Sequence, residues 1–192
     1  MMFKIIIFLF TISVFSSCTT INNTKDEEAT PWKLLLDNKT YIAKQLIKYG
    51  RQPITFISTH QELGKAIDTS YISGTQINWE LYVKPFAEAS LYDSIYDRKY
   101  RVTQLVDSSS ATVQLTYLPS FSNLEVQKMF IAIDEMDNKI NNIYIERKKS
   151  EFFKTTYYKI LYNPGKQIQL QTETKPLFGK KTYTIDQLIF MI

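Results

Sequence analysis

The stretch from Gln127 to Lys149, QKMFIAIDEMDNKINNIYIERKK, decides the predicted fold. Apolar residues dominate both flanks, and Asp137 and Asn138 near the centre tolerate the left-handed backbone that tight turns need. Two apolar strands on either side of such a turn pair as an antiparallel hairpin. The sequence therefore predicts a β-hairpin over residues 127–149.

Period-two alternation extends this pattern in both directions along the chain. Residues 111–117 and 167–171 alternate apolar with polar side chains, as strands do when one face of a sheet meets water. Residues 77–84 alternate in the same way, so a strand is predicted there too. Further strands are predicted over residues 53–58, 99–106, 152–161 and 182–185.

The start of the folded region carries the signals of a helix. Thr30 and Pro31 suit an N-cap and a first helical turn, and Gly50 suits the stop. A shorter helical piece is predicted over residues 61–67. With about eight or nine strands and short connections, the sequence predicts a single α+β, mainly β domain over residues 31–192. Its strands are expected to form an antiparallel meander, either a curved sheet or an unclosed barrel, with the N-terminal helix packed on it.

Residues 1–17 have the parts of a secretion signal. Lys4 supplies the positive charge, residues 5–15 are apolar, and two serines precede Cys18, the only cysteine. The apolar run is shorter than the roughly 20 residues that a membrane-spanning helix needs. Residues 18–30 are polar and without periodicity, which predicts a flexible tether. The residue types alone also allow an ordinary secreted protein or a buried free thiol.

This leader, ending on a cysteine, resembles the lipobox of bacterial lipoproteins, with Phe15 where Leu is usual. The resemblance implies that Cys18 is acylated. The acyl chains would fasten the protein to the outer membrane of a Gram-negative-type cell envelope. Residues 25–28, KDEE, are similar to the acidic signals that send some lipoproteins to the cell surface. The periplasmic and the surface face both stay open.

Composition and motifs exclude several classes of function. The formal net charge of +4 is small and scattered, which excludes a nucleic-acid binder. A single histidine, His60, and one cysteine leave no ligand set for zinc, and the five glycines are isolated, so no phosphate-binding loop is predicted. Ser58 precedes His60, but no G-x-S-x-G motif surrounds it. We expect His60 to be an exposed loop residue or the start of a helix.

Charged residues in the chain favour solvated surfaces over catalysis. Asp93 and Asp97 lie four apart and are expected on a solvated helix face, not as a catalytic carboxylate pair. The basic runs at residues 147–149 and 180–181 could contact anionic lipid headgroups or protect strand ends from edge pairing. The sequence therefore predicts no enzyme, no cofactor and no metal site.

Two segments, residues 129–133 and 152–162, are apolar on both faces, so their second face needs a cover. The N-terminal helix or an apolar ligand could supply it.

A lipidated leader, a first helix and a meander with hairpins such as MFIAIDEMDNKINNIYIER resemble the LolA/LolB group of lipoprotein carriers and receptors over residues 31–192. The resemblance implies an apolar groove that takes up lipid or lipoprotein acyl chains. Strand alternation gives as candidate groove residues Trp79, Met129, Ile131, Phe153 and Tyr157.

The alternative is a non-catalytic structural or protein-interaction lipoprotein whose β-domain is fully packed. Its partners would be the membrane, through the lipid anchor, and another envelope protein. The two hypotheses differ in the interior. A carrier needs a continuous apolar space of several hundred Å³, whereas an interaction domain fills that space with side chains.

Overall fold

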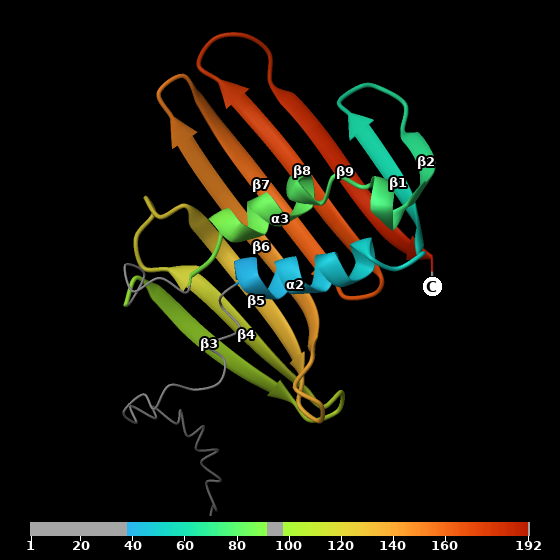
Figure 1. Ribbon diagram of the computed structural model, residues 1–192. Coiled ribbons are helices and arrows are strands. Elements are labelled where there is room, and N and C mark those ends of the chain that lie inside the picture. The colour runs from blue at the N-terminus through green and yellow to red at the C-terminus, as the bar shows by residue number, and fades with distance from the viewer. Residues whose placement is uncertain (1–37, 92–97, 192) are drawn as a thin grey trace, which may run out of the picture. The chain divides into compact units, whose positions relative to one another are not determined.

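The computed structural model describes residues 38–91 and 98–191, and its dominant feature is one antiparallel sheet of nine strands (Figure 1). These residues belong to a unit that spans Pro31–Ile192. Cys18, the predicted leader and the predicted helix face with Asp93 and Asp97 lie outside the described residues. None of the described helices has the length and apolar character that crossing a bilayer requires.

The described elements comprise two α-helices, one short 3₁₀ helix and the nine strands. The helices are α2 (Asn38–Gly50), η1 (Gly74–Gln76) and α3 (Trp79–Glu88). The strands are β1 (Thr55–Glu62), β2 (Asp68–Ser73), β3 (Tyr100–Asp107), β4 (Thr112–Pro119), β5 (Val126–Asp134), β6 (Ile140–Glu151), β7 (Lys154–Asn163), β8 (Gln167–Pro176) and β9 (Thr182–Met191). Their order across the sheet is β2-β1-β9-β8-β7-β6-β5-β4-β3.

The N-terminal hairpin completes the sheet at its C-terminal strand. Strands β3 to β9 follow one another as a meander, and β1 pairs with β9 from Thr55↔Met191 to Glu62↔Thr184. Because β2 and β3 lie at opposite edges, the chain between them must cross the sheet, and α3 lies on that crossing (Figure 1). Within the described residues the two edge strands are not paired with each other. The predicted α+β, mainly β class, with an unclosed curved sheet and an N-terminal helix, is confirmed.

The hairpin at residues 127–149 is also confirmed, as β5 and β6. Asn138 adopts φ 53° in its turn, and the Asp134 carboxylate accepts a hydrogen bond from the Met136 backbone at 2.9 Å. Short polar side chains of this kind stabilise tight turns by bonding to their own backbone. The other predicted strands, apart from residues 77–84, correspond to β1, β3, β4, β7, β8 and β9.

The strand predicted over residues 77–84 is wrong, because most of this segment forms helix α3. The strand pattern placed Tyr82 on the polar face. In the structure Tyr82 and Phe86 are the two buried residues of the helix, and they lie four residues apart on one helix face. Leu81, which the strand pattern placed inside, is exposed. Pro85 lies within this helix although proline removes a backbone hydrogen bond. Tertiary packing therefore outweighs the local preference.

The helical piece predicted over residues 61–67 is wrong as well. Strand β1 continues to Glu62, a turn follows, and β2 begins at Asp68. Gly64 adopts φ 76° in that turn, a conformation that glycine adopts without steric cost. His60 consequently lies within a strand and not in a loop or at a helix start.

The core lies between the helices and the face of the sheet that they cover, here called the inner face (Figure 1). Ile42 and Leu46 of α2, four residues apart, are fully buried, as is Phe86 of α3. The Phe86 ring packs edge to face on Tyr162 of β7, with centroids 6.2 Å apart. The helices also pack against each other. Burial of these apolar side chains is the main favourable contribution to folding.

Candidate functional site

The inner face has an apolar half and a polar half, built on the same strands. On β7, Ile160 and Tyr162 belong to the apolar half, whereas Thr156 and Tyr158 continue the same face toward the β6–β7 turn. Their neighbours on β8 follow the same division, with Leu170 beside Ile160 and Thr174 beside Thr156. The helices cover the apolar half (Figure 1).

The apolar half is sealed by side chains of the protein itself. Nine of the largest side chains of its strands are almost completely inaccessible to water: Phe56, Met129, Ile131, Ile133, Ile143, Ile145, Ile160, Tyr162 and Ile168. An empty groove wide enough for a ligand would leave such side chains accessible to a water molecule. Burial this complete therefore indicates a packed interior in this conformation.

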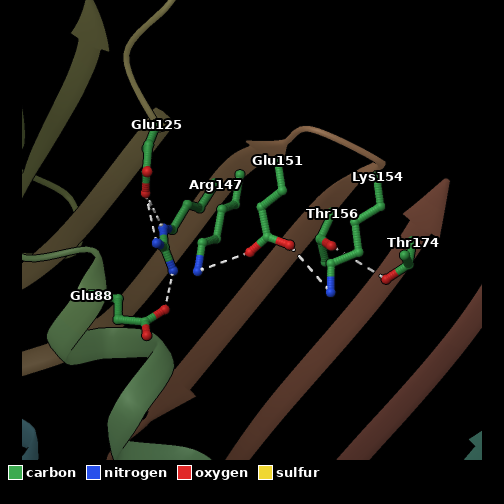
Figure 2. Close-up of polar contacts among 8 residues, drawn as sticks. Glu88, Glu125, Arg147, Glu151, Lys154, Thr156 and Thr174 are labelled. Atoms are coloured by element: carbon green, nitrogen blue, oxygen red, sulfur yellow. Dashed lines mark hydrogen bonds and ion pairs between the residues drawn. The ribbon is translucent and has the colours of Figure 1, made fainter. Parts of the chain in front are cut away.

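Arg147 of β6 links the sheet to helix α3 at the border between the two halves (Figure 2). Its side chain is only 5% exposed. Its Nε and Nη2 donate to the Glu125 carboxylate at 3.0 and 2.6 Å, and Nη1 donates to the Glu88 carboxylate of α3. The guanidinium also lies over the Tyr158 ring, 5.6 Å from its centroid.

Two carboxylates keep this buried guanidinium charged. Burial disfavours the charged form, but the hydrogen bonds that the guanidinium donates to Glu125 and Glu88 outweigh that effect, and the pKa of Arg147 is raised. Arg147 therefore holds helix α3 on the sheet through Glu88. It is the one residue of the basic run at 147–149 that is buried, so its guanidinium is not available to lipid headgroups.

Beyond Arg147 the polar half continues as ion pairs and two threonine hydroxyl groups (Figure 2). Glu151 lies between Lys149 and Lys154, with N···O distances of 3.3 and 3.2 Å. The hydroxyl oxygens of Thr156, which is buried, and of Thr174 are 3.4 Å apart on neighbouring strands, so only the ion pairs are exposed. Exposed pairs of this kind add little to stability, so they characterise a hydrated surface.

His60 lies at the far side of the polar half, on β1. Its Nδ1 is 2.6 Å from an Asp186 oxygen of β9, and its Nε2 is 3.6 Å from Glu62. The hydrogen bond with Asp186 and the nearby Glu62 carboxylate raise the pKa of His60 above its ordinary value. Because both ring nitrogens face carboxylates, the charged imidazolium is favoured. A general base must instead be neutral and reach a hydroxyl proton, so this arrangement does not suit His60 as the base for Ser58.

Sequence reasoning could not find these two polar groups. Asp186 is 126 positions from His60, and Glu88 is 59 positions from Arg147. No local motif encodes such pairs, and the basic run at residues 147–149 gives no sign of which member is buried. Among the residues that the structure describes, no group of three or more His, Cys, Asp or Glu side chains could hold a metal ion.

The structure brings together only two of the five candidate groove residues. Met129 and Ile131 are buried side by side on the inner face of β5. Tyr157 lies on the opposite face of the sheet, because its β6 partner is Lys148 whereas the inner face carries Arg147. Lys175 lies over the Tyr157 ring, 4.8 Å from its centroid.

The other two candidate groove residues lie outside the sheet. Phe153 is exposed in the β6–β7 turn. Trp79 begins helix α3, where its Nε1 donates to the Gly74 carbonyl at 2.9 Å. These five side chains therefore do not form one wall in this conformation.

Comparison of the chain with known protein families, with curated proteins and with solved structures finds no match.

Proposed function

We propose that the protein is a lipid-anchored protein of a Gram-negative-type cell envelope whose domain is non-catalytic and binds partners through its surface. The observation that carries the domain's part of the proposal is the sealed apolar half of the inner face. Its strand side chains are inaccessible, and Ile42, Leu46 and Phe86 of the helices close it from above. A domain with a packed interior offers its surface for binding.

The anchor rests on the sequence alone. A leader with Lys4 and an apolar run ends on Cys18, and an acyl chain contributes about 0.8 kcal/mol per buried methylene, so several chains on one residue hold a protein on a membrane stably. The tether over residues 18–30 would leave the domain free to contact that membrane or a neighbour. The proposed location is the outer membrane, on either its periplasmic or its surface face.

Acyl-chain binding in a groove, as the resemblance to lipoprotein carriers implies, is the second candidate. One observation favours it: the apolar half is covered by two helices that pack on each other, and Arg147 and Glu88 form a polar link to one of them. Displacement of α2 and α3 would expose a continuous apolar strip. In this candidate function an acyl chain replaces the helices, and the apolar area it buries supplies the affinity.

Mass spectrometry tests the lipid anchor, which both candidate functions share. The full-length protein is expressed in a Gram-negative bacterium and extracted from its membranes, and its intact mass is compared with that of a Cys18→Ala variant. We expect a mass increase for several acyl chains on the wild-type chain and none on the variant. A wild-type chain without added acyl mass would refute the anchor.

Retained lipids and uptake of a fluorescent fatty acid then test the interior. The wild-type protein is compared with Glu88→Gln, which weakens the link between α3 and Arg147, and with Glu80→Gln, an exposed acidic residue of the same helix, as control. If the domain is packed, we expect no uptake of fatty acid by the wild type or by either variant. Uptake that rises selectively in Glu88→Gln would instead establish the carrier function.

A further inference from the structure

Three neighbouring hairpin turns carry most of the exposed apolar side chains at one end of the sheet. They are the β1–β2, β8–β9 and β6–β7 turns, which follow one another because the strand order there is β2-β1-β9-β8-β7-β6. All three lie together at the upper end of the sheet in Figure 1. Six side chains on these turns, here called the apolar tips, are between 60% and 87% exposed: Leu63, Ile67, Phe152, Phe153, Leu177 and Phe178.

The apolar tips are held in place by the backbone. The Leu177 amide donates to the Phe153 carbonyl at 2.7 Å, which joins the β8–β9 and β6–β7 turns. The Leu63 amide donates to the Tyr183 carbonyl at 3.0 Å, which joins the β1–β2 turn to β9. The rings of Phe152 and Phe153 pack edge to face, with centroids 4.5 Å apart. The tips therefore form a fixed row, which six strands at about 4.8 Å spacing make about 24 Å long.

Lysines surround this row. Four acidic residues, Asp68 and three glutamates, lie in the tip segments or the strand ends next to them, against six lysines in the same segments: Lys65, Lys149, Lys154, Lys175, Lys180 and Lys181. Glu173 is shared between Lys175 and Lys181, at 3.1 and 2.9 Å, and Glu151 is shared between Lys149 and Lys154. Each shared carboxylate leaves one positive charge in excess. Long lysine side chains can extend from an apolar base to charged headgroups.

The turns at the other end of the same sheet have the opposite character. The β3–β4 turn contains three serines after Asp107, and the β5–β6 turn contains Asp134, Glu135 and Asp137. Met136 is the only large apolar side chain that is strongly exposed in the turns at that end. Apolar exposure with lysines is therefore a property of one end and not of hairpin turns in this protein generally.

We propose that the apolar tips insert into the headgroup region of an anionic lipid bilayer, with the surrounding lysines bound to the lipid phosphates. Large exposed apolar groups rimmed by charge mark an interaction site. Phenylalanine and leucine side chains beside lysines are typical of protein surfaces that bind in the membrane interface. The shape favours a bilayer over a protein groove, because the apolar side chains project from three separate turns and do not line one concave surface. This inference extends the proposed membrane location but does not depend on acylation of Cys18.

Tryptophan substitutions at the tips test this directly. The full-length protein carrying Phe178→Trp or Phe153→Trp is incorporated into vesicles of phosphatidylglycerol and phosphatidylethanolamine that contain nitroxide-labelled lipid. Met136→Trp, at a turn of the opposite end and 84% exposed in the wild type, is the matched control. We expect blue-shifted and quenched tryptophan emission, above the background of Trp32 and Trp79, for the two tip variants only. Because the substituted side chains are exposed, the variants retain the core packing, which far-ultraviolet circular dichroism verifies.

The charge requirement is tested in the same vesicles. Quenching of the tryptophan emission in Phe178→Trp should fall when Lys180→Gln and Lys181→Gln are added to this variant. It should also fall when phosphatidylcholine replaces phosphatidylglycerol in the vesicles. A third decrease is expected in about 1 M salt, where the Debye length falls to about 3 Å. Equal quenching in anionic and neutral vesicles would overturn the role of the lysines.

Tip tryptophans quenched no more than Met136→Trp would overturn the insertion itself and leave the tips as a protein-docking surface. The intact mass at Cys18 keeps the two proposals apart. Unacylated Cys18 with quenched tips refutes the anchor alone. Acylated Cys18 with unquenched tips refutes the insertion alone.

Discussion

Strand β7 crosses both halves of the inner face, and its side chains change character where the helices end. Under the helices it presents the buried apolar side chains of Tyr162 and Ile160, and from the level of Arg147 onward it presents the polar side chains of Tyr158 and Thr156, of which Thr156 is still buried. Its ladders with β6 and β8 run unbroken through both halves, up to the pairs that Lys154 makes. The backbone pairing is thus the same in the two halves, and only the helical cover differs. Stability is therefore expected to reside in the covered half, and surface binding in the open half and its tips.

The largest effect should come from a cavity in the covered half. Phe86→Ala removes a fully buried ring that packs on Tyr162, and such truncations typically cost about 3–5 kcal/mol. Thr174→Ala in the polar half is the matched control and should change the free energy of unfolding by less than about 1 kcal/mol. Urea unfolding followed by circular dichroism measures both. Equal losses in the two variants would contradict the division of the inner face.

The next largest effect is expected at the border between the halves. Arg147→Met removes the charged hydrogen bonds to Glu88 and Glu125, worth about 1.5–3 kcal/mol for such a group. Lys149→Met breaks only an exposed ion pair and should cost between 0 and about 1 kcal/mol. The same unfolding measurement distinguishes them. If both variants lost the same small amount, Arg147 would not hold the helical cover on the sheet.

A smaller effect is expected at His60, and it depends on pH. The hydrogen bond with Asp186 raises the pKa of His60 above 6.5 in the folded protein. The stability that this pair contributes is therefore fully present below about pH 6.5 and disappears as the pH rises through the folded pKa. Asp186→Asn should therefore destabilise the protein more at pH 5.5 than at pH 8.5. His60 is the only histidine, so its nuclear magnetic resonance signal gives the pKa directly. A pKa that Asp186→Asn leaves unchanged would contradict the pairing.

The smallest effect belongs to the turns at the end opposite the apolar tips. Ala111 adopts φ 47° before β4, a left-handed conformation that costs a residue with Cβ roughly 1–2 kcal/mol. Ala111→Gly removes that strain but adds conformational freedom to the unfolded chain. The free energy of unfolding, measured by urea unfolding, is therefore expected to rise by a net amount of about 0.5 kcal/mol. Asn138→Gly, at φ 53°, should be close to neutral because Asn tolerates this region. A loss of stability in Ala111→Gly would show that the turn is not strained.

Most strands could be predicted because their signal is local. Residues 111–117 and 127–149 alternate or form a hairpin in the sequence, and β4, β5 and β6 follow that pattern. Residues 77–84 alternate with period two, as a strand does, and yet most of them form a helix. Burial of Tyr82 and Phe86, which lie four residues apart on one helix face, selects the helix.

The five candidate groove residues do not lie on one surface of this structure, for a related reason. Tyr157 and Phe153 were selected for apolar character in a doubly apolar segment, and alternation alone does not say which face a helix covers. The structure puts Tyr157 on the outer face and Phe153 in a turn, next to apolar residues of turns that are distant in sequence. The row of apolar tips is likewise invisible in sequence, because residues 63–67, 152–153 and 177–178 become neighbours only through the strand order.

The sequence by itself determined most of the sheet-forming segments, the turn at Asp137 and Asn138, and the features of the leader that end on Cys18. Side-chain period, turn chemistry and apolar run length act over a few residues, so they are encoded locally. Only the tertiary structure decided that β1 pairs with β9, that Arg147 bonds to Glu88, and that His60 bonds to Asp186. These contacts join residues that are far apart in the chain. They form only when the whole sheet buries its apolar half under the helices, because that burial fixes the register that brings them together.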